Sequence, residues 1–116
     1  MSLCETVSIL ANELEQQLDD LSENHINMLS VMKEMPKYLE QGNLASWEKD
    51  YKTAISERED EQSINYKAID LLYEIAGLNL FGEFQVEDTI KIYSHAVNEL
   101  KKMNINITNN LNVEKW

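Results

Sequence analysis

A chain of 116 residues, 43% of them hydrophobic, is long enough for one domain with a modest core, so its composition argues against intrinsic disorder. Its 21 acidic and 10 basic residues give a formal net charge of −11, which disfavours direct contact with nucleic acid or an anionic membrane. A single cysteine excludes an internal disulfide, and no apolar run is long enough to span a membrane.

The scarcity of turn-forming residues predicts an all-α protein. Three glycines and one proline leave few places where the chain can reverse, so the elements between them must be long. We expect one helical domain over residues 1–116, an antiparallel three-helix bundle with helices at roughly 3–40, 43–77 and 86–108. The first two helices form a long hairpin and would each be about 50 Å long at 1.5 Å per residue.

The first predicted helix carries an apolar stripe that repeats after eighteen residues, or five helical turns. Pro36 should kink or stop this helix one turn before its end, and Gly42 should close it in a left-handed conformation. The residues expected to face inward are Leu3, Val7, Leu10, Leu14, Leu21, His25, Met28, Met32 and Leu39.

The second predicted helix begins at Asn43, a good N-cap residue, and ends at Gly77. Its two apolar stripes are separated by the polar run SEREDEQS, residues 56–63. The connector that follows, GLNLFGEF, is too apolar for a plain solvent loop and should fold back over the bundle.

The third predicted helix has the most regular period. Apolar residues recur in alternating steps of four and three from Val86 to Leu111, which is the a/d pattern of a coiled-coil seam, with Asn104 as its one polar member. Three helices leave a fourth bundle position empty, so we expect homodimerisation or a bound partner helix.

A polar layer is predicted where the first two helices pass each other. If they form a hairpin about Gly42, His25 lies level with Glu59, and the polar run of one helix faces the polar stretch of the other. Such a layer would supply hydrogen-bond partners to the His25 imidazole and fix how the two helices align. The alternatives are a pH switch at His25 and an exposed polar band that binds a partner. The members of the layer are His25, Arg58, Glu59 and Gln62.

The sequence lacks the residue patterns that are typical of catalytic sites. The only histidines, His25 and His95, lack the Glu-x-x-His spacing of helical di-iron sites, and zinc would need more histidine or cysteine. Cys4 has the character of a half-buried side chain, and there is no glycine-rich phosphate loop. We therefore expect no enzyme activity, no cofactor and no metal.

Large apolar side chains provide the candidates for partner binding. The aromatic pair beside the Gly42 turn is either a plug at the end of the bundle or a binding anchor. The methionines of the first stripe are either core filling or an adaptable groove for helices. The candidate partner-binding residues are Trp47, Tyr51, Met28, Met32, Phe81 and Tyr93.

The stretch LEQGNLASWEKDYKTAISERED, residues 39–60, resembles small flagellar and type III export chaperones. These have a long first helix, a short Gly-Asn or Gly-Asp turn, and a second helix that opens with spaced large residues and carries Glu-Arg pairs. The resemblance covers residues 5–78 at most. It implies a cytoplasmic, non-enzymatic protein that shields an amphipathic helix of an export substrate.

Three functions fit the sequence. The first is a small cytoplasmic chaperone or adaptor that shields an amphipathic helix of a partner protein. The second is an acidic inhibitor, immunity protein or DNA mimic that blocks a cationic site. The third is a structural bundle that assembles only with itself. All three imply a protein partner, helical or basic, or a second copy of the chain.

Overall fold

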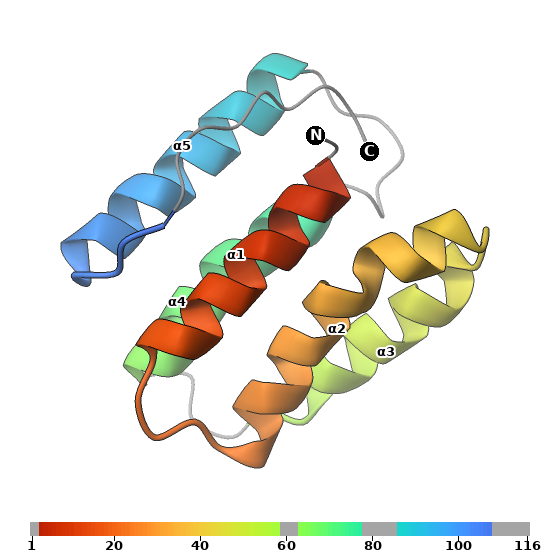
Figure 1. Cartoon of the computed structure of the whole chain (residues 1–116), viewed down its shortest axis with the longest axis horizontal. Helices are drawn as coiled ribbons and strands as arrows, with labels where there is room; N and C mark the ends of the chain where they lie inside the picture. The colour runs from red at the N-terminus through yellow and green to blue at the C-terminus, as the bar shows by residue number, and fades with distance from the viewer. Residues whose placement is uncertain (1–2, 59–62, 78–85, 108–116) are drawn as a thin grey trace.

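The computed structural model describes residues 3–58, 63–77 and 86–107, with the side chains of residues 3, 4 and 86–90 left out of that description. In these residues the chain forms five α-helices and no strand, which confirms the predicted all-α class (Figure 1). The helices are α1 (Leu3–Gln17), α2 (Glu23–Glu40), α3 (Leu44–Ser56), α4 (Ile64–Gly77) and α5 (Val86–Lys102).

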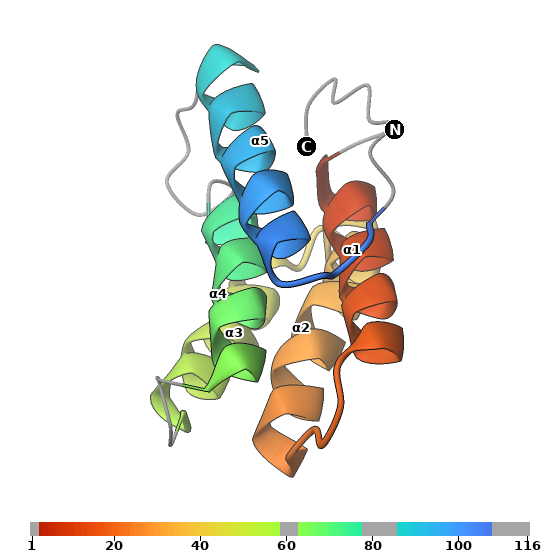
Figure 2. The same cartoon turned by 90° about the vertical axis from the view of Figure 1, so that its left-hand side faces the viewer.

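The helices pack around one core. α1, α2 and α4 each contact the other two, α3 lies along α2, and α5 lies along α4 (Figures 1 and 2). The most deeply buried side chains come from the first four helices and from the end of α5. Those with under 2% of their surface exposed and the largest volume are Trp47, Leu10, Leu14, Met28, Leu29, Met32, Met35, Ile69, Leu72, Ile75 and Leu100.

The helix predicted at 3–40 is two antiparallel helices, so that prediction is wrong. α1 ends at Gln17, and the chain reverses through a link in which Asp20 has a φ of 56°. α2 then starts at the N-cap Ser22. α1 and α2 each bury an apolar stripe with the same 3.6-residue period. In the sequence, the two stripes therefore look like one continuous stripe. Periodicity alone therefore could not reveal the turn.

The helix predicted at 43–77 is also two helices, α3 and α4. The break between them, residues 57–63, lies within the polar run, which has no apolar side chain to bury in a helical hairpin. The two 50 Å rods of the sequence prediction are therefore replaced by four shorter helices. The molecule measures 33 × 28 × 20 Å along its principal axes.

The turn at Gly42 was predicted correctly. Gly42 has a φ of 68°, and its N–H donates to the carbonyl of Leu39 while the N–H of Asn43 donates to that of Tyr38. This is the Schellman pattern that ends helices at a left-handed residue. α2 runs through Pro36 to Glu40 before it. Asn43 holds the N-cap position of α3, but its side chain makes no capping hydrogen bond.

Replacing Gly42 with alanine should lower the free energy of unfolding by about 1 kcal/mol, because an L side chain is disfavoured at positive φ. The cost is conformational alone, since a Cβ placed here would meet no atom within 4 Å. Urea unfolding followed by circular dichroism measures it. Gly42→Asn should be tolerated better, and an alanine variant as stable as the parent would contradict the assignment.

The third predicted helix ends earlier than expected, at Lys102 instead of 108. Asn104 has a φ of 63°, and the N–H groups of Asn104 and Ile105 donate to the carbonyls of Lys101 and Leu100. Asn104 is therefore the left-handed residue of a second Schellman turn, not a polar member of a helical seam. Asparagine supports this conformation better than most residues with a side chain.

Candidate protein-binding surface

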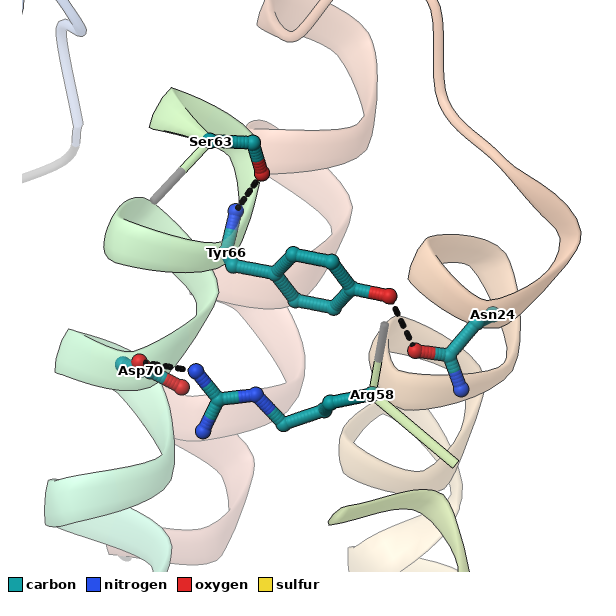
Figure 3. A network of polar contacts seen from close by, with 5 residues as sticks. All are labelled: Asn24, Arg58, Ser63, Tyr66 and Asp70. Atoms are coloured by element: carbon teal, nitrogen blue, oxygen red, sulfur yellow. Dashed lines mark hydrogen bonds and ion pairs between the residues drawn. The ribbon is translucent and has the colours of Figure 1, made fainter. Parts of the chain in front are cut away.

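Two members of the predicted polar layer, His25 and Arg58, come together around Tyr66 of α4, and Figure 3 shows Arg58 beside this tyrosine. The ring of His25 meets the ring of Tyr66 edge to face, with centroids 4.3 Å apart. The guanidinium of Arg58 lies 5.3 Å from the centroid of the same tyrosine ring. Glu59 and Gln62 lie outside the described residues. That this polar layer fixes the alignment of neighbouring helices stays a prediction.

Further polar contacts of this tyrosine and its neighbours connect separate parts of the chain. The Tyr66 hydroxyl hydrogen-bonds Asn24 Oδ1 at 2.5 Å, and Arg58 forms an ion pair with Asp70 at 2.7 Å (Figure 3). Asn65 Nδ2 donates to the carbonyl of Asp19 at 3.0 Å. These contacts join the start of α2, the end of α3 and the start of α4. The sequence pattern predicts one continuous helix over 43–77 and so does not bring Tyr66 close to His25, whereas a separate helix begins at Ile64.

His25 has a definite local role. It is the third residue of α2, and its Nδ1 accepts from the N–H of the N-cap Ser22 at 2.9 Å. The Ser22 hydroxyl in turn accepts from the His25 N–H at 3.2 Å. This reciprocal pattern is a capping box with histidine where glutamate or glutamine is usual. The polar stretch around His25 is therefore the start of a helix, not the middle of one.

Most of the predicted partner-binding residues are buried. Met28, Met32 and Trp47 have no exposed surface, and Tyr93 is 7% exposed. Tyr51 is half-buried, and Phe81 lies outside the described residues. A partner could reach the three fully buried side chains only if the helices separated, so their role in binding stays a prediction.

The aromatic residues beside the Gly42 turn form a stack inside the bundle. Trp47 and Tyr51 have ring centroids 5.2 Å apart, and Tyr51 stacks on Tyr73 at 4.8 Å. Trp47 Nε1 donates to the carbonyl of Val31 at 2.8 Å, and the Tyr73 hydroxyl donates to that of Met28 at 3.0 Å. These bonds satisfy the polar atoms of the buried rings, as a core role requires.

The stability of the protein should fall as the pH rises above about 10. Burial raises the pKa of Tyr51 and of Tyr73, and burial together with the charge of Glu13 raises the pKa of Tyr93 to about 12. An unfolded chain loses these protons near pH 10, the ordinary value for tyrosine, whereas the folded chain keeps them. Unfolding therefore releases protons in this range, and alkali favours the unfolded state.

Urea unfolding at neutral pH and at about pH 11 tests this linkage. Tyr93→Phe should lose less stability than the parent between these two conditions, since phenylalanine has no proton to release. An equal loss in parent and variant would show that Tyr93 does not contribute to the alkaline sensitivity.

A shallow groove runs between α2 and α3 on the outside of the bundle. It consists of two adjoining hollows of about 330 and 410 Å³ that share Asn27 and Glu57. Among the described residues, four acidic side chains and no basic one line it, with small residues between them. The lining comprises Glu23, Asn24, Asn27, Ser30, Val31 and Glu34 from α2, Asp50, Thr53 and Ala54 from α3, and Glu57 at its C-cap.

The acids of this α2/α3 groove take part in none of the ion pairs in the described part of the chain. Within residues 3–58, 63–77 and 86–107, the ion pairs are Lys33–Glu15, Lys52–Glu48, Arg58–Asp70 and Lys102–Glu99, and none includes an acid of the groove. Asp50 accepts a hydrogen bond from the Tyr38 hydroxyl at 3.0 Å, which raises the pKa of that tyrosine. The groove therefore presents a negative potential to solvent.

The described part of the chain contains no group of three or more histidine, cysteine or acidic residues placed to hold a metal ion. None of its helices combines the length and apolar character needed to cross a bilayer. Comparison with protein-family models, curated proteins and solved structures finds no match. Function is therefore inferred from the geometry of the α2/α3 groove.

Proposed function

We propose that this protein is a non-enzymatic binding module, a small chaperone or adaptor, whose α2/α3 groove holds a cationic amphipathic helix of a partner protein. The observation that carries the proposal is the groove itself, lined by four acids and no base on the outer face of a helix pair. Its charge complements lysine and arginine on the partner, and a helix laid along two others buries its apolar side between them.

The groove also indicates what its partner should look like. Glu23 and Glu34 are eleven residues apart on α2, about 16 Å at 1.5 Å per residue. Asp50 and Glu57 are separated by two turns, about 10 Å. Between these acids lie Val31 and the buried Ala54, which allow close approach. The fitting helix carries basic residues two to three turns apart, with small apolar residues between them.

A labelled helical peptide of this design, about 15 residues long, tests the proposal by fluorescence anisotropy. Glu34→Gln combined with Asp50→Asn should weaken binding about twofold to thirtyfold, since each of the two exposed charge pairs that are lost contributes about 0.2–1 kcal/mol. The matched control is Glu40→Gln with Glu74→Gln, which removes two exposed acids that lie outside the groove. Equal weakening by both pairs would mean that only the net charge attracts the peptide.

The net charge of −11 also favours the second function, an acidic inhibitor or DNA mimic that covers a cationic site. That function predicts competition between this protein and nucleic acid for the same basic protein, with binding lost steeply as salt rises. Binding of the designed helix that survives high salt would instead favour a groove in which apolar contact contributes.

A further inference from the structure

The last described residues of the chain form a strap from α5 to α1. After the turn at Asn104, residues 103–107 leave the end of α5 and cross to α1 (Figure 2). Ile105 is 4% exposed, and Met103 and Ile107 pack partly buried against the core. α5 itself packs mainly against α4, and the strap adds a connection to the first helix.

One side chain of α1 holds this strap by its backbone. Gln17 Oε1 accepts from the Asn106 N–H at 2.8 Å, and Gln17 Nε2 donates to the Asn106 carbonyl at 2.5 Å. The two bonds join residues 89 positions apart in the sequence. Both lie at the exposed surface, where water can replace them, and so they are individually easy to break.

The hinge of the strap is conformationally unfavourable. Asn104 adopts a φ of 63°, which disfavours any residue with a Cβ, although asparagine less than most. The turn at Asn104 therefore favours opening of the strap. The two hydrogen bonds of Gln17 and the packing of Ile105 and Ile107 favour closing. Segments balanced in this way open locally without unfolding the rest of a protein.

We infer that Gln17 is a latch: releasing this one side chain frees the strap and the C-terminal end of α5 from α1, while α1 to α4 stay folded. The inward face of α5 is covered by its packing on α4, with Val97 and Leu100 only 3% and 1% exposed. This inference does not depend on the α2/α3 groove.

Amide hydrogen exchange of the full chain, read by NMR, tests the latch. Gln17→Ala should speed exchange of the Asn106 amide and of the last turn of α5 about tenfold, as expected for two lost hydrogen bonds. Amides of α4 serve as the reference and should be unchanged. Gln16→Ala is the matched control, because Gln16 is the neighbouring exposed glutamine and should alter nothing.

Unchanged exchange at the end of α5 in Gln17→Ala would overturn the latch, and so would equal acceleration in α4 or in the Gln16 variant. A second pair of variants tests the hinge without touching the clamp. Asn104→Gly should slow opening of the strap and Asn104→Ala should speed it, because glycine relaxes the left-handed turn and alanine strains it. The reverse order would contradict the inference.

Discussion

Replacing Trp47 with alanine should lower the free energy of unfolding by about 3–5 kcal/mol, the largest single effect we expect in this chain. Trp47 has no exposed surface and is the largest side chain in the core. Its ring contacts that of Tyr51 at a tilt of 33°, and its Nε1 donates to the carbonyl of Val31 across the α2–α3 hairpin. Alanine would leave a cavity where α3 meets α2. A small domain is stable by only about 5–15 kcal/mol, so the variant should be close to unfolding.

Trp47→Phe separates the two contributions of the side chain. Phenylalanine keeps much of the buried apolar surface but cannot donate to Val31, so its cost should be smaller, with about 1 kcal/mol from the lost hydrogen bond. Urea unfolding followed by circular dichroism measures both variants. If Trp47→Ala cost less than 1 kcal/mol, Trp47 would not be the core residue described here.

The all-α class could be predicted because it depends on composition, and the Gly42 turn because it depends on a local signal. Few glycines and prolines leave long helices, and Gly-Asn after a helical stripe marks a left-handed end. The inward positions were also largely correct, since Val7, Leu10, Leu14, Met28 and Met32 are all buried. Helical periodicity identifies the buried face of a helix wherever the helix lies.

The two missed turns show what periodicity cannot reveal. Asp20 and Asn104 adopt left-handed conformations with a side chain present, so neither turn is marked by a glycine. Ser22 and His25 form a capping box whose third-position residue is not the usual acid or amide, so the sequence pattern indicates a polar interruption within a helix instead of a helix start. The breaks that follow α1 and α3 are therefore not predicted, and α2 and α3 are expected as parts of two longer helices.

The second large effect should come from Tyr66, the centre of the contacts in Figure 3. Tyr66→Ala should cost about 3 kcal/mol, because this 3% exposed ring fills the space between α2 and α4 and meets both His25 and Arg58. Arg58 has a side chain only 16% exposed. Without the ring it loses its cation–π contact, while its ion pair with Asp70 remains.

Tyr66→Phe distinguishes packing from hydrogen bonding at this centre. It keeps the ring between His25 and Arg58 and removes only the hydroxyl that bonds Asn24, so it should cost about 1 kcal/mol. Amide hydrogen exchange then shows which helices lose protection in each variant. Tyr66→Ala should open the start of α2 and the start of α4 together, because the ring joins them, and should leave α5 protected. Loss of protection confined to α4 would show that α2 is held at this end by its capping box alone.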